Sequence, residues 1–487
     1  MTFITSLIDR LIRRALHALA TLLMPMIAAC APQLATPPAV PDTAPVRMDE
    51  RAFSNDAYDA RWWRLFDDPV LERLVNMALE ANHDIRIAIA RLDQSRAIFD
   101  DTARDRYPTV TVGAAVDVRE QAIAGFAEEP VRTNTYQAGF DAFWEIDLFG
   151  RVRSAVAAAR ASAEGFEAAL DDVRVSVAAE VARNYFEYRG VQQQLAVLDR
   201  SLANQRETLR LTTVRRDAGI GQKQDVASAA ARVAAIEAAV PPLRAALAAL
   251  EHRLAVLVGR RPGALEVDLS PRPYPVLRTA LPLGDVTTML RRRPDVRAAE
   301  RRVAEAAARA GIATADLWPR VTVSGVLGLL AGRGTIFGTG DSRAWAVTPA
   351  LSWAAFDLGS ARARVRGAQA YVRESIAAFE QTTLFALEEL DTALAAYREQ
   401  QQRLVSLAAQ ARESARAADI ARARYREGVA DFLSLLDAER TQLEAERAVA
   451  EAEASVFTAA VAIYKTLGGI DDHHVPTAEA TLASNGR

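Results

Sequence analysis

Two patterns of apolar and polar positions follow one another along the chain, one repeating every seven residues and one every two. The seven-residue pattern is clearest in the second half, at Ile376, Thr383, Leu390, Tyr397, Leu404, Ala411, Ala418 and Tyr425. Such a repeat over many turns predicts a long helix in a left-handed supercoil. A matching alanine-rich helix is predicted at residues 154–217, where it would be about 100 Å long.

The two-residue pattern predicts two pairs of strands. From Tyr136 to Leu148 the even-numbered positions are apolar and those between are polar or small, except Phe143, and residues 109–118 alternate in the same way. A weaker pair is predicted at residues 321–327 and 345–353, where Pro349 is expected to cause a bulge or weak pairing. Long alternation with aromatic residues in the apolar set is typical of strands that face lipid on one side and water on the other.

The helices alone fit a soluble antiparallel coiled coil equally well, but the strands favour a membrane protein. Four strands cannot cross a bilayer alone, because both sheet edges would leave unpaired backbone groups in hydrocarbon. A barrel must then close between copies of the chain, and two, three or four copies would supply eight, twelve or sixteen strands. The properties of the strands alone do not decide how many copies of the chain form the barrel. No apolar run of about 20 residues follows the amino-terminal segment, so we expect no transmembrane helix there.

The two halves of the chain repeat one another. Asp84-Ile85-Arg86 matches Asp295-Val296-Arg297 at a spacing of 211, and Gly219 matches Gly428 at 209. Residues 131–240 and 350–475 contain no proline, whereas residues 262–294 are rich in it, which predicts two helical halves joined by an irregular segment. The expected parts are a signal peptide (1–29), a lipidated tether and equatorial segment (30–66), a first repeat (67–261), an equatorial linker (262–285), a second repeat (286–470) and a tail (471–487).

The amino terminus predicts export and a lipid anchor. Arg10, Arg13 and Arg14 precede an apolar stretch that ends in Ile27-Ala28-Ala29-Cys30, similar to a bacterial lipobox. Cys30 is the single cysteine, so it cannot form an internal disulfide and is a candidate for a diacylglycerol and an acyl chain. We expect no cofactor other than these covalent lipids. The alternative is a chance cysteine after an ordinary signal sequence.

Composition and charge exclude several other classes. Half of the 487 residues are apolar and the formal net charge is -3, so nothing indicates disorder or a nucleic-acid-binding surface. The five histidines lack metal-ligand spacing, and the glycines at 332–340 lack the strand-and-helix context of a dinucleotide loop. We therefore expect no enzymatic activity and no metal site.

Several motifs together resemble those of TolC-type outer-membrane factors, in particular the branch of drug-efflux outer-membrane lipoproteins. The resemblance covers residues 30–470, and its most specific pieces lie at 62–69, 82–85, 147–152, 292–297, 424–428 and 433–438. It implies a mixed α and β membrane protein with four strands per protomer in a shared outer-membrane β-barrel, continued by a long α-helical coiled-coil barrel. It also implies a homotrimer in the outer membrane of a Gram-negative cell, extending into the periplasm.

The implied function is the passive channel of a tripartite efflux system, which exports drugs and toxic compounds through a periplasmic adaptor. The resemblance implies that an inner-membrane pump of the RND type delivers these compounds. A conduit for type I protein secretion or for metal-cation efflux shares this architecture. A lipid-anchored periplasmic coiled-coil scaffold is the alternative from another class.

The resemblance places the candidate site residues at the two helix turns. Gly219 and Gly428 would form turns whose tips contact the adaptor, although glycine also suits any such turn. Leu433 and Asp437 lie four residues apart and match the pore aperture, where copies of Asp437 would form a negative ring. Arg424 and Tyr425 would link neighbouring helices, with Asp225 as a partner. The alternative for these polar residues is solvated helix surface with ion pairs.

Overall fold

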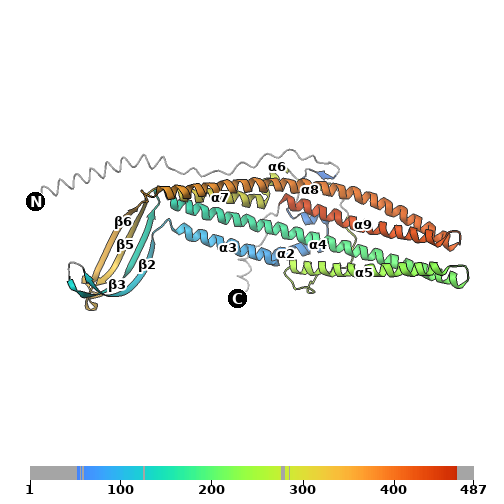
Figure 1. The fold of residues 1–487 in the computed structure, drawn as a ribbon, viewed down its shortest axis with the longest axis horizontal. Coiled ribbons are helices and arrows are strands. Elements are labelled where there is room, and N and C mark those ends of the chain that lie inside the picture. The colour runs from blue at the N-terminus through green and yellow to red at the C-terminus, as the bar shows by residue number, and fades with distance from the viewer. Residues whose placement is uncertain are drawn as a thin grey trace. The chain divides into compact units, whose positions relative to one another are not determined.

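A computed structural model describes residues 52–54, 56, 60–123, 127–275, 280–283 and 286–468. Residues 1–51, with the predicted signal peptide and Cys30, and the predicted tail lie outside these ranges. The longer elements occur in the same order in both halves, namely a helix, two strands, a long helix and a return helix (Figure 1). The first half contains α3 (His83–Arg104), β2 (Thr109–Ile123), β3 (Ala127–Ile146), α4 (Arg151–Asp217) and α5 (Lys223–Leu257). The second contains α7 (Pro294–Ala315), β5 (Arg320–Ala331), β6 (Arg343–Ser352), α8 (Leu358–Arg426) and α9 (Phe432–Leu467).

Shorter elements flank these repeats. They are β1 (Phe53–Ser54), the 3-10 helix η1 (Trp62–Phe66), α2 (Pro69–Ala81), β4 (Leu281–Pro282), α6 (Val286–Arg292) and the 3-10 helices η2 (Gly334–Ile336) and η3 (Gly340–Ser342). The described chain forms two compact units. Unit 1 comprises residues 91–167 and 298–380, and unit 2 comprises residues 60–90, 168–297 and 381–468 together with β1, within the described ranges.

Unit 1 contains one antiparallel sheet with the strand order β2-β3-β5-β6 (Figure 1). One cross-strand row joins Val112, Phe140, Leu327 and Trp345, whose exposed fractions are 77%, 54%, 64% and 78%. The next row joins Thr111, Asp141, Val326 and Ala346 on the other face. The register therefore confirms both predicted strand pairs and the separation of an exposed apolar face from a more polar one.

Pro349 lies in a regular part of this sheet, so the predicted bulge is wrong. The β5–β6 register runs without a shift from Arg320 opposite Ser352 to Leu329 opposite Arg343, and it includes Pro349 opposite Val323. Because β6 is an edge strand, a residue without an amide hydrogen is tolerated there.

Equivalent tryptophans connect the sheet of unit 1 to the chain that precedes it. The indole nitrogen of Trp144, near the end of β3, donates to the carbonyl oxygen of Arg106 at 3.1 Å. Trp353, just after β6, donates in the same way to the carbonyl oxygen of Leu317 at 3.0 Å. Each hydrogen bond fixes the end of one strand against the segment that enters the preceding strand.

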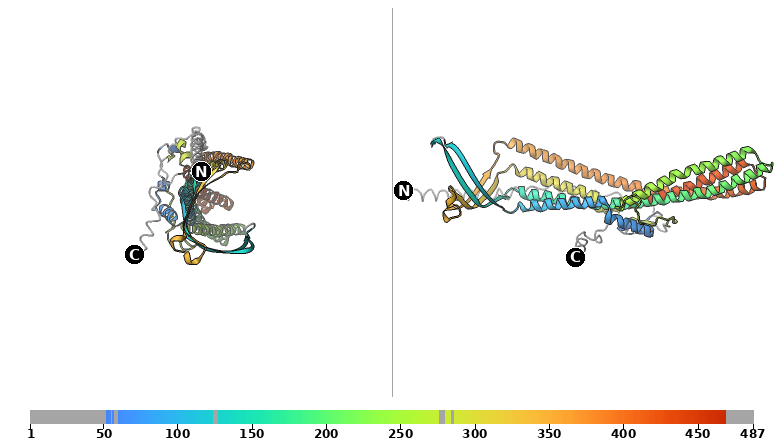
Figure 2. Two further views of the ribbon diagram at one scale, coloured as in Figure 1. Left: turned by 90° about the vertical axis from the view of Figure 1, so that its left-hand side faces the viewer. Right: turned by 90° about the horizontal axis from the view of Figure 1, so that it is seen from below.

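Unit 2 contains the distal parts of α4 and α8 together with α5 and α9, which lie side by side (Figure 2). The heptad positions of α8 face inward, as predicted, because Leu390, Tyr397 and Ala418 are each at most 1% exposed. At the other end of this unit, aromatic side chains from η1, α4 and α9 pack together, including Trp62 stacked on Tyr464 and Phe186 on Phe457.

One described helix, α5, is long and apolar enough to cross a membrane by length and composition. The expectation that the sequence after the signal contains no such helix was therefore too strict, since an alanine-rich helix with few charges passes the same test. Only 11% of the apolar window of α5 is buried within the chain, and Pro241 and Pro242 lie inside this helix.

Candidate functional site

The two predicted turns have the same backbone geometry. Gly219 and Gly428 have φ angles of 77° and 78°, which only glycine adopts readily. In the first turn the amides of Gly219 and Ile220 donate to the carbonyls of Arg216 and Arg215, at 2.9 and 3.0 Å. The second turn repeats this pattern at positions 209 residues later. Both long helices thus end in a Schellman cap, which reverses the chain within a few residues.

Tyr425 is the centre of a cluster that joins the two turns. It is 4% exposed and packs with Ala229 of α5 and with Phe432 and Leu435 of α9. The guanidinium of Arg215, on α4, lies 4.9 Å from the centre of the Tyr425 ring and donates to the Tyr425 carbonyl oxygen at 2.9 Å. A cation at the carboxyl end of α8 is favourable for the helix dipole as well as for the ring.

The candidate linking residues have different environments. Burial raises the pKa of Tyr425, the charge of Arg215 opposes this shift, and the charge of Asp225 adds to it. Arg424 is exposed on the protomer. The residue that contacts Tyr425 from α4 is Arg215, which the sequence reasoning missed. The repeat could have revealed it, because Arg215 is equivalent to Arg424 at the spacing of 209.

Leu433 and Asp437 lie on the first two turns of α9 and point to solvent in the protomer. Leu433 is 71% exposed, and the Asp437 carboxylate accepts a hydrogen bond from Arg440 Nη2 at 2.9 Å. Both side chains are free to face a shared axis if copies of the chain surround one. Their role as an aperture stays a prediction.

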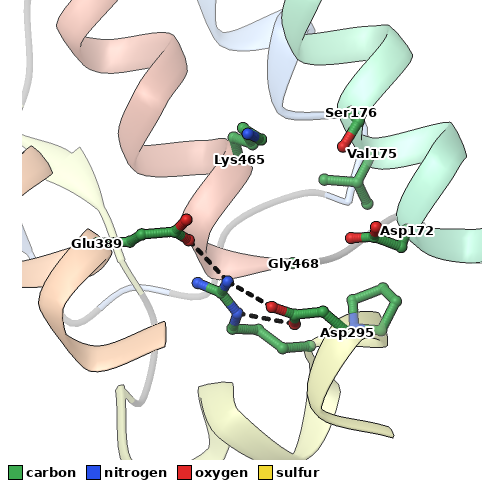
Figure 3. A pocket seen from close by; sticks show the side chains of 9 residues that line it. Asp172, Val175, Ser176, Asp295, Glu389, Lys465 and Gly468 are labelled. Carbon is green, nitrogen blue, oxygen red and sulfur yellow. Dashed lines mark hydrogen bonds and ion pairs between the residues drawn. The ribbon is translucent and has the colours of Figure 1, made fainter. Parts of the chain in front are cut away.

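A second polar site, which the sequence reasoning did not single out, is a cavity of about 190 Å³ in unit 2 (Figure 3). Arg293 forms its base: Nη2 donates to Asp295 at 2.7 Å and to Glu389 at 2.8 Å, and Nη1 donates to the Thr466 carbonyl oxygen at 3.1 Å. Asp172, Ser176 and Lys465 lie around the same space. Burial raises the pKa of Asp172, and Asp295 adds to this shift, whereas Arg293 and Lys465 oppose it.

This arrangement of an open four-stranded sheet with one long helical hairpin in each repeat defines a class of protein, the protomer of an outer-membrane channel. The family model described as "Outer membrane efflux protein" matches residues 74–260 and 286–469, and the chain belongs to this family.

Individual relatives agree with this assignment. The chain is 30% identical to outer membrane protein OprJ of Pseudomonas aeruginosa over 416 residues, 85% of this chain and 87% of that protein. It is 27% identical to nodulation protein T of Rhizobium leguminosarum bv. trifolii over 406 residues, 83% of this chain and 86% of that one. Among solved structures, the outer-membrane channel OprN matches with a TM-score of 0.86 and 47% identity, over 90% of this chain and 99% of OprN.

These matches confirm the predicted family, the mixed α and β channel fold and the location in the Gram-negative outer membrane. They also confirm the predicted function as an outer-membrane channel component of efflux systems. The matched relatives are channel proteins and not enzymes.

Proposed function

We propose that three copies of this chain form a passive export channel that receives small molecules from an inner-membrane pump through a periplasmic adaptor. The sheet topology carries this proposal. β2 and β6 are edge strands of a sheet with one exposed apolar face, so backbone groups along both edges need partners in a bilayer. Equivalent edges on further copies supply these partners, and three copies give a twelve-stranded barrel.

Small molecules are the favoured cargo. A relative named as the outer membrane protein of a solvent efflux pump in Pseudomonas putida is 28% identical over 428 residues, 86% of this chain. A deletion strain complemented with this chain should regain resistance to apolar drugs or solvents. Restored secretion of a protein or restored tolerance of metal cations, without any change in drug susceptibility, would favour the other conduits.

The adaptor is expected to bind the two turns. Each turn exposes one aliphatic residue directly after its glycine, Ile220 at 70% and Val429 at 62%. Their replacement by aspartate should abolish resistance and co-purification of the adaptor while leaving the trimer intact. Normal adaptor binding by the double variant would contradict this placement.

Asp437 is proposed to narrow the pore with Leu433. The Asp437→Ala variant should raise the leak current of the purified channel in planar bilayers, because it removes a charge ring from the narrowest point. Glu413→Ala is a matched control, since Glu413 is an exposed carboxylate paired with Arg416 on α8. Equal currents in wild-type protein and the Asp437 variant would count against the aperture.

A further inference from the structure

The more polar face of the four-stranded sheet carries an exposed aromatic ring. Phe143 of β3 lies on this face between Thr109 of β2 and Ser324 of β5, and it is 55% exposed. Among the strand positions that the structure describes on this face, Phe143 is the only aromatic residue. It is also the residue that interrupts the apolar and polar alternation of β3. More than half of its surface is open to a ligand, and burial of an aromatic ring is a large apolar gain.

A carboxylate without a partner lies beside this ring. Asp141 precedes Phe143 by two residues on β3, so both side chains lie on the same face, about 7 Å apart along the strand. Asp141 is exposed, and its carboxylate has no ion-pair or hydrogen-bond partner among the described residues. Its Oδ2 atom lies 3.6 Å from the place where Gly113 of β2 would carry a Cβ atom. The glycine has no side chain, so it leaves the carboxylate uncovered.

The other charged side chains described on this face of the sheet are all in ion pairs. These pairs are Asp117 with Arg119 at 2.8 Å, Glu145 with Arg151 at 2.6 Å and Arg320 with Asp316 at 2.6 Å. Among the sheet residues that the structure describes, Asp141 therefore supplies the one uncompensated charge on the polar face. A ligand that pairs with it must be positively charged.

Val326 of β5 extends the apolar surface of the ring. It lies directly opposite Asp141 in the β3–β5 register and is 45% exposed. Because Phe143 lies opposite Ser324, Val326 is a diagonal neighbour of Phe143, which is within reach of an aromatic side chain. Phe143 and Val326 thus form an apolar surface that borders the Asp141 carboxylate. A cation is attracted to the carboxylate and to the ring face, and an apolar body packs on the rest.

We propose that Asp141, Phe143 and Val326 form a binding site for apolar organic cations. The positive centre of such a ligand lies near Asp141, and its apolar groups pack on Phe143 and Val326. The site rests on the proposed function in one respect, because the polar face lines a pore only when several copies close the barrel. It deepens that function, since three such sites around the pore would retain one chemical class of cargo there.

The test measures equilibrium dialysis of tetraphenylphosphonium against the purified full-length channel in nanodiscs, with empty nanodiscs as the blank. Tetraphenylborate is the matched control ligand, because it has a similar size and apolar surface but the opposite charge. The binding-site variants are Asp141→Asn, Phe143→Leu and Phe143→Ser. Glu413→Gln is the control variant, since Glu413 is an exposed carboxylate of α8, outside the sheet. The amount of heat-resistant oligomer is compared for all variants.

Wild-type protein should bind tetraphenylphosphonium about tenfold more tightly than tetraphenylborate, and added salt should weaken this preference. Asp141→Asn should weaken binding of the cation about tenfold, equivalent to about 1.4 kcal/mol. Phe143→Ser should weaken it about threefold to tenfold, and Phe143→Leu less, because leucine keeps the apolar contact but not the ring face. Glu413→Gln should bind like wild-type protein.

Equal binding of the two ions by wild-type protein, or cation binding that is independent of salt, would overturn the inference without recourse to any variant. Assembled Asp141→Asn protein that binds the cation as tightly as wild-type protein would do the same. Wild-type protein that binds the cation but conducts no ions in planar bilayers would overturn the proposed channel and leave this site in place.

Discussion

At the scale of single residues, Asn82 and Arg293 occupy equivalent positions, 211 residues apart, and anchor equivalent helix ends. Asn82 Nδ2 donates to the Leu257 carbonyl oxygen at the end of α5 at 2.8 Å, and Arg293 donates to the Thr466 carbonyl oxygen at the end of α9. The donor to the helix end is a neutral amide in the first repeat and a charged guanidinium in the second. The arginine therefore brings Asp295 and Glu389 into the contact as well.

Both anchors should stabilise the protein measurably. Asn82→Ala is expected to lower the free energy of unfolding by about 1–3 kcal/mol, because it leaves the Leu257 carbonyl buried without its donor. Arg293→Met should lower it by at least as much, since it also removes the donor of the Thr466 carbonyl. Denaturant unfolding of the purified protein measures both changes, and Arg183→Met, at an exposed ion pair, serves as the control. An Arg293 variant as stable as this control would disprove the anchoring role.

Asp172 should make stability depend on pH. Its pKa in the folded chain lies above the ordinary value of 3.8, mainly because of burial. As pH falls, the Asp172 carboxylate therefore takes up a proton in the folded state before it does so in the unfolded state. The stability of the folded state rises between the folded-state pKa and 3.8, and both states are protonated at lower pH. Asp172→Asn should be more stable than wild-type protein near neutral pH, and this advantage should shrink on acidification. A pH-independent difference in unfolding temperature would contradict the assignment.

At the scale of elements, the sheet separates its two faces residue by residue. Val347 and Thr348 are neighbours on β6 and lie on opposite faces, since they pair with Gly325 and Ser324. A lysine on the lipid-facing side near the bilayer midplane destabilises a membrane barrel by about 2–4 kcal/mol. Val347→Lys should therefore lower the stability of the barrel by about this amount and reduce assembly in the outer membrane. Thr348→Lys, on the more polar face, should assemble normally. The amount of heat-resistant oligomer in membrane fractions measures the difference, and equal amounts would argue against the orientation of the sheet.

The glycines that end the helices differ in what surrounds them. At Gly219 an added Cβ atom meets nothing within 4 Å. Gly219→Ala should therefore lower the free energy of unfolding only by the strain of a positive φ, about 1–2 kcal/mol. At Gly259, which has a φ of 72°, the Cβ atom would collide with the backbone of Ala81. Gly259→Ala should therefore be more destabilising by about 1–3 kcal/mol. Denaturant unfolding distinguishes the two variants, and equal effects would show that the close approach to α2 is unimportant.

At the scale of the whole molecule, periodic features were predictable and individual side-chain contacts were not. The heptads of α8, the alternation in β3 and the turn glycines each follow from local spacing, so the sequence was sufficient for them. The contact of Arg215 with Tyr425 depends on packing between segments more than 200 residues apart. Pro349 was misjudged because its tolerance depends on the edge position of β6, which only the pairing order reveals.

The lipid anchor and the sheet should contribute separately to membrane association. Cys30→Ser removes the predicted site of acylation but leaves the apolar face of the sheet, so the protein should still require detergent and form a heat-resistant oligomer. Labelling with radioactive palmitate should be lost in this variant. A variant that is soluble without detergent would show that lipidation, rather than the sheet, holds the protein in the membrane.

Pro241 and Pro242 give the two hairpins different stiffness. Neither proline has an amide hydrogen, so the carbonyls of Glu237 and Ala238, four residues earlier, lack their usual donors within α5. The equivalent positions in α9 are Ala450 and Glu451, which keep theirs. Under the same bending force, α5 should flex at this point while α9 stays straight, so the two hairpins of each copy respond unequally despite their common architecture.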